Sequence, residues 1–185
     1  MAESFTNSLG RAVGVVTTAT GGSIGIQTNK VTGISTTGIG VSAIVDNQHY
    51  IAGTKVLNFG TAAQEVVFDR DSTNTASASS QTLKFLGVTT TYTSTAGEKA
   101  ILIGGTFANL TESNINVYVE IYDNSAAGTA HSTSLLASDI PIPNGSSFVI
   151  SEAGKTVIEQ DDQVRVYCDT ANAVDVNLAI LSGVS

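Results

Sequence analysis

Hydrophobic and polar residues alternate most regularly from residue 83 onward. Residues 114–123 are the clearest case, since apolar side chains recur there with a period of two, which is typical of a strand with one buried face. Similar runs, separated by Gly, Pro, Asn and Ser, predict strands at 88–93, 99–108, 114–123, 134–142, 147–150, 155–158, 163–168 and 173–181. No segment keeps the apolar period of a helix over more than about two turns. The pattern predicts an all-β chain whose residues 83–185 form an antiparallel β-sandwich, either immunoglobulin-like or jelly-roll-like.

The first part of the chain follows other patterns. Residues 1–24 show little periodicity and many small side chains, so we expect an extended N-terminal arm that becomes ordered only against a partner. Residues 25–72 hold short runs of Val and Ile between Gly and Asn, which predict a small β-rich domain supported by its neighbour or by partner chains. Residues 73–82 contain no large apolar side chain and predict a linker. The domain organisation is therefore expected to be arm, small β-rich domain, linker and sandwich.

Composition and charge narrow the possible functions. The 185 residues include 24 Thr and 20 Ser, and only 13% are charged, against about 25% in an average globular domain. The 8 basic and 16 acidic residues give a net charge of −8, and the basic ones are scattered, which argues against nucleic acid and anionic membrane surfaces as partners. No apolar run approaches the length of about 20 residues that crosses a membrane. The acidic N-terminus lacks the basic region of a signal peptide, so we expect a chain that is made in a cytoplasm and is not exported by that route.

Few residues could carry chemistry. His49 and His131 stand in separate loop-like segments without a nucleophile elbow, and the single Cys168, in an alternating strand, is expected to be buried and inert. The acidic pair in 69–71 lacks the Gly and the distal Glu of a calcium loop. The Gly pair 104–105 interrupts a strand and predicts a β-bulge rather than a phosphate loop. We therefore expect no catalytic residue, no metal site and no cofactor.

Residues for assembly are easier to nominate. Tyr118 and Tyr122 share one side of the strand 114–123 with Glu120 between them, which predicts a half-wet outer sheet face at a subunit contact or, alternatively, a sugar-binding platform. The apolar residues of the arm are expected to lie buried between chains. The expected interface residues are Arg11, Val13, Val15, Val16, Ile24, Ile26, Tyr118 and Tyr122.

The C-terminal half resembles the small β-sandwich virion proteins of tailed bacteriophages, notably those of cyanobacterial phages. In residues 89–123 the resemblance consists of a Tyr-Thr strand, an Ala-Gly turn, an apolar strand ending in Ala-Asn and a strand of alternating Val. The segment 139–150, with Pro-Ile-Pro-Asn-Gly-Ser-Ser, the closing strand 175–181 and the opening segment 5–15 are similar to the same proteins. In shorter members the opening segment leads almost directly into the sandwich, whereas here residues 25–82 intervene.

The resemblance implies a non-enzymatic virion component. Because the chain is small, acidic and arm-bearing, a capsid decoration protein on the particle exterior is the leading expectation. A neck, collar or tail-fibre accessory protein is one alternative, and Gly53-Thr54-Lys55-Val56 resembles β-turn repeats of phage fibres and decoration proteins. A glycan- or receptor-binding module that uses the loop 124–133 or the Tyr118 and Tyr122 face is another. The expected partners are identical copies, as a homotrimer, and other virion proteins such as the major capsid protein or neck and tail proteins.

Overall fold

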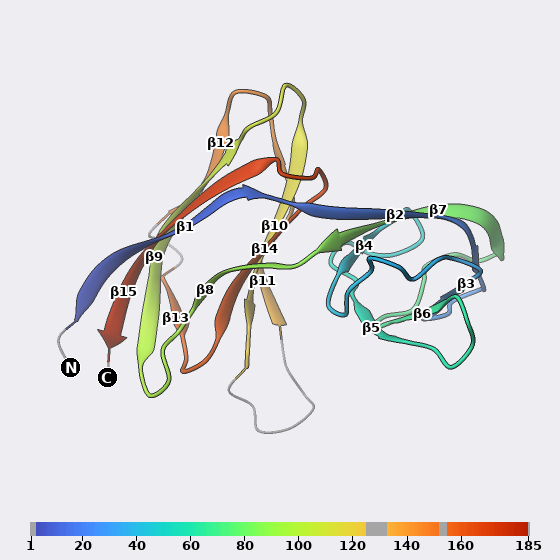
Figure 1. The fold of residues 1–185 in the computed structure, drawn as a ribbon, viewed down its shortest axis with the longest axis horizontal. Helices are drawn as coiled ribbons and strands as arrows, with labels where there is room; N and C mark the ends of the chain where they lie inside the picture. The colour runs from blue at the N-terminus through green and yellow to red at the C-terminus, as the bar shows by residue number, and fades with distance from the viewer. Residues whose placement is uncertain (1–2, 125–132, 152–154, 185) are drawn as a thin grey trace. The chain divides into compact units, whose positions relative to one another are not determined.

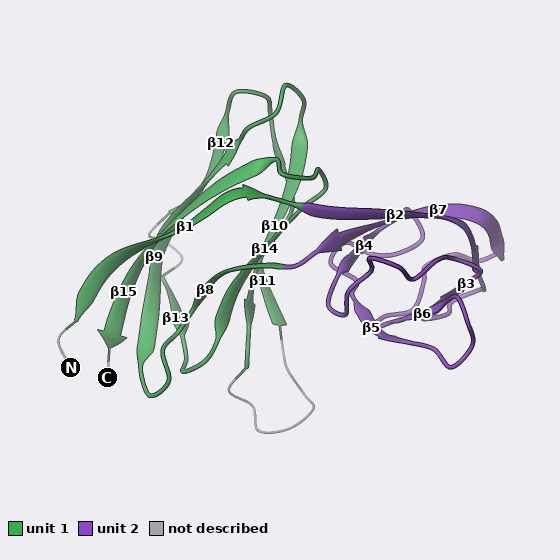
Figure 2. Cartoon of the chain, viewed as in Figure 1, with its two compact units in different colours: residues 1–14, 89–185 green, residues 15–88 purple. Residues whose placement is uncertain are grey.

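The computed structural model describes residues 3–124, 133–151 and 155–184, and none of these residues lies in a helix (Figure 1). The chain is all-β, as predicted. It divides into two compact units, one made of residues 1–14 together with 89–185 and the other of residues 15–88 (Figure 2). We call the first the sandwich unit and the second the barrel unit.

Two antiparallel sheets form the sandwich unit. Sheet I has the order β1-β15-β9-β12, with β13 also paired to β9, and sheet II has the order β11-β10-β14-β8. The strands are β1 (Ser4–Val13), β8 (Thr89–Thr93), β9 (Lys99–Asn109), β10 (Ile115–Tyr122), β11 (Thr133–Ile142), β12 (Ser147–Ile150), β13 (Thr156–Ile158), β14 (Gln163–Cys168) and β15 (Val174–Val184). Every strand expected from residue 88 onward is confirmed, and β1 is added to them.

The strand pairs of the sandwich unit are nested along the chain. β1 pairs with β15, β8 with β14, β9 with β12 and β13, and β10 with β11. A long antiparallel ribbon rolled into two facing sheets has this order, which is that of a jelly roll. The nesting therefore selects the jelly-roll alternative over the immunoglobulin-like one.

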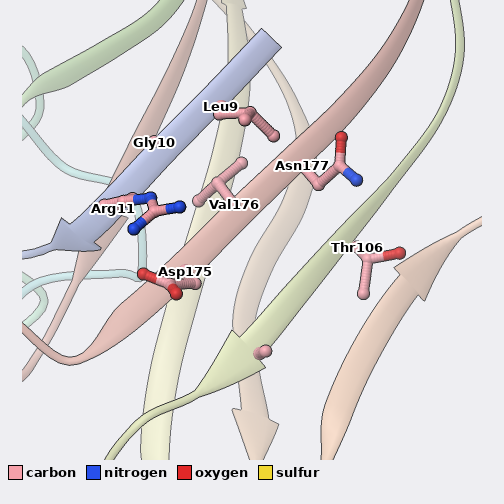
Figure 3. A pocket seen from close by; sticks show the side chains of 8 residues that line it. Leu9, Gly10, Arg11, Thr106, Asp175, Val176 and Asn177 are labelled. Atoms are coloured by element: carbon pink, nitrogen blue, oxygen red, sulfur yellow. The ribbon is translucent and has the colours of Figure 1, made fainter. Parts of the chain in front are cut away.

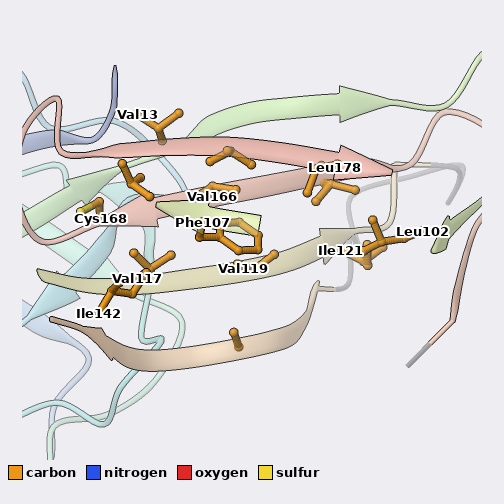
Figure 4. Packing of buried hydrophobic residues seen from close by; sticks show 14 of the residues in the cluster. Val13, Leu102, Phe107, Val117, Val119, Ile121, Ile142, Val166, Cys168 and Leu178 are labelled. Carbon is orange, nitrogen blue, oxygen red and sulfur yellow. The ribbon is translucent and has the colours of Figure 1, made fainter. Parts of the chain in front are cut away.

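The core of the sandwich unit lies between sheets I and II (Figure 4). Sheet I contributes side chains such as Phe107 and Leu178, and sheet II contributes Val119 and Val166. The alternating residues of 114–123 all point into this core, as their period predicts. The predicted bulge is also present, since the β9–β15 register shifts immediately before Gly104.

Residues 4–24 do not form an arm that needs a partner chain to become ordered. β1 pairs with β15 from Ser4 to Val13, and residues from Val15 to Ile24 form β2, a strand of the barrel unit. Val13 is 3% exposed in the sandwich core and Ile24 is 0% exposed in the barrel core. The prediction that Val13 and Ile24 are anchors between chains is therefore wrong, because both fill cores of their own chain.

The barrel unit is a sheet that closes on itself. Its order is β4-β7-β2-β3-β6-β5. The Ile44–Lys55 bridge and the hydrogen bond from Val45 N to Thr54 O, at 2.8 Å, join the two ends of this order. The strands not yet given are β3 (Lys30–Thr32), β4 (Ile44–Asp46), β5 (Val56–Phe59), β6 (Glu65–Phe68) and β7 (Ala78–Gly87). Ile24, Val31, Phe68, Leu83 and Phe85 are among the residues of its core.

The predicted linker and the predicted boundaries of the small domain are also wrong. β7 begins at Ala78, inside the segment 73–82, and pairs with β2. Residues 25–72 therefore lack only the strands that the neighbouring segments supply, and they need no partner chain to complete their sheet. The chain passes between the units at 14/15 and at 88/89 instead.

The barrel unit is an insertion between the first two strands of the jelly roll, β1 and β8. Its ends are neighbours, because Val15 pairs with Gly87. Gly14 marks the exit from the sandwich unit with a φ of +137°, and its carbonyl accepts a hydrogen bond from Asn172 N at 3.0 Å. A Cβ at Gly14 would lie 2.2 Å from the carbonyl oxygen of Thr170, so the exit requires glycine.

Candidate interaction surface

The structure distributes the expected interface residues over both units. Arg11 is exposed on the sandwich unit. Val15 and Ile26 are exposed and Val16 is half-buried on the barrel unit. The expected interface residues are therefore divided between the two units.

The Tyr118 side of β10 is buried, not half-wet. Tyr118 is 4% exposed and its hydroxyl donates to Asp139 Oδ1 at 3.0 Å. Glu120 is 0% exposed and accepts a hydrogen bond from the hydroxyl of Tyr167 at 2.7 Å. The prediction of a half-wet outer face at this position is therefore wrong, because the polar atoms are satisfied inside the protein.

Tyr122 lies at the end of the same row. It is half-buried, and the guanidinium carbon of Arg165 lies 3.3 Å from the centre of its ring, in a cation–π contact. The Nε of Arg165 donates to Gln163 Oε1 at 2.9 Å. Tyr122 is thus held by its own sheet.

Burial keeps the hydroxyl of Tyr167, which contacts Glu120 from the neighbouring strand β14, in its protonated form. Burial, and after it the charge of Glu120, raises the pKa of the Tyr167 hydroxyl above its ordinary value of 10.0. Tyr167 therefore remains a neutral donor to Glu120 at neutral pH. This hydrogen bond links β14 to β10 inside the protein.

Two of the other candidate groups, Cys168 and Asp69, have structural roles. Burial raises the pKa of the Cys168 thiol to about 11, so the sulfur is a poor nucleophile. Asp69 Oδ1 accepts from the backbone N of Lys55 at 2.8 Å, and the Asp162 carboxylate accepts from two backbone N–H groups, at 3.1 and 3.2 Å.

Within the described ranges, no three of His, Cys, Asp and Glu gather closely enough to bind a metal ion. His131 and residues 125–132 of the proposed glycan loop lie outside the described residues. The described part of the chain contains no helix that is long and apolar enough to cross a bilayer.

The outer face of sheet I, which points away from the core, carries a row of apolar side chains. Pairing aligns Phe5, Leu181, Ile101 and Val157 in one row across β1, β15, β9 and β13. Phe5 is 76% exposed and Val157 is 52% exposed. Apolar side chains that cross a whole sheet and remain in water are typical of an interaction site. We call this surface the apolar face.

A second row crosses the apolar face farther along the strands. Pairing places Leu9, Asn177, Thr106 and Val149 side by side on β1, β15, β9 and β12. Leu9 is 62% exposed and Val149 is 56% exposed, so the apolar side chains protrude at the two margins of the sheet.

Two hollows flank this second row. One, of about 290 Å³, lies between Leu9 and Arg11 of β1, Asp175 and Asn177 of β15 and Thr106 of β9 (Figure 3). The other, of about 330 Å³, lies over Gly104 and Gly105 and extends to Val149 and Ile150.

The apolar face carries charge only at its ends. Arg11 and Asp175 lie at one end, and Lys99 lies at the other, paired with Glu159 at 2.9 Å. Between these ends, every residue of β1, β15, β9, β12 and β13 is uncharged.

Sequence reasoning missed the apolar face, although a signal was present. Ala100 to Ile103 and Leu178 to Leu181 are continuous apolar runs within strands 99–108 and 173–181. A continuous run, unlike an alternating one, indicates a strand whose two sides are both covered. Sheet II covers one side, and the other side is the apolar face.

No protein-family model matches the chain, and no curated protein matches it.

Proposed function

We propose that the chain is a non-enzymatic structural component of a tailed-phage virion, bound to the particle exterior as a capsid decoration protein. The observation that carries the proposal is the apolar face, which exposes apolar side chains across a whole sheet and carries charge only at its ends. A surface of this kind serves assembly rather than catalysis.

Two further arguments support the proposal. Residues 89–123 and 139–150 resemble phage virion proteins, as described above. Jelly rolls are also common in viral capsid domains, an argument from fold analogy that raises the expectation without identifying a site. Identical copies and other virion proteins, such as the major capsid protein, are the partners that this role requires. A neck, collar or tail accessory protein would need the same kind of interface, so this role is the alternative position on the virion.

The test is quantitative gel electrophoresis of purified virions from the phage that encodes the chain, with antibody detection of the protein. Hundreds of copies per particle are expected for capsid decoration. A number that fits a single ring would place the protein at the neck or tail instead, and its absence from the particle would contradict a virion role.

A glycan-binding module is the second candidate. The smaller hollow favours it, because Arg11, Asp175, Asn177 and Thr106 surround an apolar floor with groups that can hydrogen-bond hydroxyls, and lectin domains are often jelly rolls. Binding of the full chain to a glycan array, abolished by Asn177→Ala, would support this candidate over decoration.

A further inference from the structure

The turn between β11 and β12 carries the one Asn-Gly pair of the sequence, Asn144-Gly145. The N–H of Ser146 donates to the carbonyl of Pro143 at 3.2 Å, and Gly145 has a φ of +70°. A positive φ at the third residue is typical of a type II turn, in which glycine is the favoured residue at that position. The Asn-Gly pair therefore forms the tip of a tight turn.

The two groups of this pair that can react with each other are both accessible. Asn144 and Gly145 are exposed, and a Cβ at Gly145 would meet nothing within 4 Å. Among the described residues, neither the side-chain amide of Asn144 nor the backbone N–H of Gly145 has a hydrogen-bond partner. No hydrogen bond therefore holds the nitrogen of Gly145 away from the side chain of Asn144.

Hydrogen bonds fix the two ends of the turn. The Nδ2 of Asn109 donates to the carbonyl of Ile142 at 2.9 Å, and the backbone N of Asn109 donates to the carbonyl of Ser146 at 3.1 Å. Glycine populates both signs of φ, so the peptide plane between Asn144 and Gly145 can flip while these ends stay in place. The flip changes the approach of the Gly145 nitrogen to the Asn144 side chain.

We propose that Asn144 is a site of spontaneous covalent modification, at which the folded protein converts this asparagine into aspartate and isoaspartate. The nitrogen of Gly145 attacks the side-chain carbonyl carbon of Asn144, and the new C–N bond closes a five-membered succinimide. The side-chain nitrogen leaves as ammonia and takes the proton of the Gly145 nitrogen. Water then adds to one of the two ring carbonyls and opens the ring. The reaction needs no oxidant or reductant, because it is an acyl transfer followed by hydrolysis.

The modification changes both the charge and the backbone of the turn. Each conversion replaces a neutral amide by a carboxylate, which adds one negative charge to a chain whose net charge is −8. Isoaspartate also leads the main chain through the former side chain, so that it inserts a carbon atom into a turn whose ends are fixed. The inference goes beyond the proposed function and does not depend on it.

Incubation of the full chain in water enriched in heavy oxygen, at neutral and at mildly alkaline pH, tests the proposal. Peptide mapping by mass spectrometry should find heavy oxygen at residue 144, and faster uptake at the higher pH, because the attacking nitrogen must lose its proton. Asn172 is the internal control, since it is also exposed in a turn but the N–H of the following Ala173 donates to the carbonyl of Val13 at 3.0 Å. Residue 144 should convert more than about tenfold faster than Asn172.

Asn144→Gln is the matched control variant, because it keeps an amide at the tip of the turn while its extra methylene disfavours closure of the ring. Uptake at residue 144 should be lost in this variant, and melting curves check that it folds like the unchanged protein. A residue 144 that remains asparagine in the folded protein, or that converts no faster than Asn172, would overturn the proposal. Equal uptake in Asn144→Gln would indicate direct hydrolysis of the amide and would overturn the attack by Gly145.

Discussion

Gly14 shows how much a single residue decides in this fold. It stands where the chain leaves β1 for the barrel unit, with a φ that side-chain-bearing residues rarely adopt and with the Thr170 carbonyl against its Cα. Its own carbonyl is fixed by Asn172 N. The position therefore has no room for any other amino acid.

We predict that Gly14→Ala lowers the free energy of unfolding of the sandwich unit by at least about 2 kcal/mol, since it adds both backbone strain and a clash with backbone. Gly40→Ala is the control, because nothing lies within 4 Å of a Cβ at Gly40. Its effect should stay within about 1 kcal/mol. Differential scanning calorimetry measures both, and equal effects of the two substitutions would contradict the strain at Gly14.

The buried thiol of Cys168 and the buried hydroxyls of two tyrosines predict that the protein becomes less stable at alkaline pH. The pKa of Cys168 is raised from 9.0 to about 11, so above pH 9 the unfolded chain releases this proton while the folded chain keeps it. The unfolded state is then favoured, by up to about 1.4 kcal/mol for each pH unit and group. Tyr167 and Tyr50, whose pKa values burial raises above 10.0, add to the loss above pH 10.

Urea denaturation at several pH values between 7 and 11 measures this slope. Cys168→Ala should flatten the slope between pH 9 and pH 10, although the cavity makes the variant less stable at pH 7. Tyr167→Phe should flatten it only above pH 10. A wild-type stability that stays constant up to pH 11 would contradict the predicted shifts.

At the scale of elements, Asn109 shows how a turn is fixed between the two sheets. Its Nδ2 donates to the carbonyls of Ser113 and Ile142, at 2.7 and 2.9 Å, and its Oδ1 accepts from Thr111 N at 2.8 Å. The side chain is 9% exposed. It therefore takes the place of the backbone hydrogen bonds that β9 and β10 lose where the chain crosses from sheet I to sheet II.

Asn109→Ala is expected to lower the free energy of unfolding by about 2–3 kcal/mol, because it removes the donor to the Ile142 carbonyl and the acceptor of the Thr111 N–H. Asn58→Ala, at an exposed position of β5, is the control and should change stability by less than about 0.5 kcal/mol. Chemical denaturation followed by fluorescence or circular dichroism compares the two. A loss below about 1 kcal/mol at Asn109 would show that water replaces the side chain.

The sequence predicted strands well where apolar and polar residues alternate with a period of two. The strand 114–123 alternates without interruption and became β10, whereas β2 and β7 were missed. β2 contains the pair Gly21-Gly22, and its register against β7 shifts on both sides of Gly22. Such bulges break the period of two, and Gly and Thr replace the large residues that would reveal it. The Ser-rich start of β7 gives an equally weak signal, since Ala78, which packs against the barrel core, is its one apolar residue before Leu83.

The assembly of strands could not be predicted in the same way. Nothing in residues 4–13 specifies that they pair with residues 174–184, because the pairing is decided by the whole ribbon. The apolar face was hidden for a related reason. Its residues come from strands far apart in sequence, and only the register of sheet I shows that Phe5 and Val157 share a row.

At the scale of the molecule, the chain is one jelly roll interrupted by a closed barrel. Each unit has its own core, and the ends of the insertion lie on paired neighbours in β2 and β7. Paired residues have Cα atoms about 5 Å apart. The insertion can therefore be removed without stretching the chain that remains.

We predict that replacing residues 15–88 by a short Gly-Ser linker between Gly14 and Thr89 leaves a folded sandwich unit, and that residues 15–88 fold alone. Each should melt cooperatively with a β-type circular dichroism spectrum. Deleting residues 1–24 is the contrasting variant, because it removes β1 from the sandwich unit and β2 from the barrel unit. Both transitions should then be lost, and a deletion that melts like the full chain would contradict the unit boundaries.

The nested pairing of the jelly roll also sets an order of events on the ribosome. The barrel unit can close as soon as residue 88 has left the exit tunnel, because all of its strands have then been made. β1, although synthesised first, has no partner until β15 has emerged at the other end of the nascent chain. Contacts of such long sequence separation form slowly. The segment that is translated first is therefore among the last to form its native pairing. Until β15 has emerged, the nascent chain exposes an unpaired β1 strand while the barrel unit is already folded.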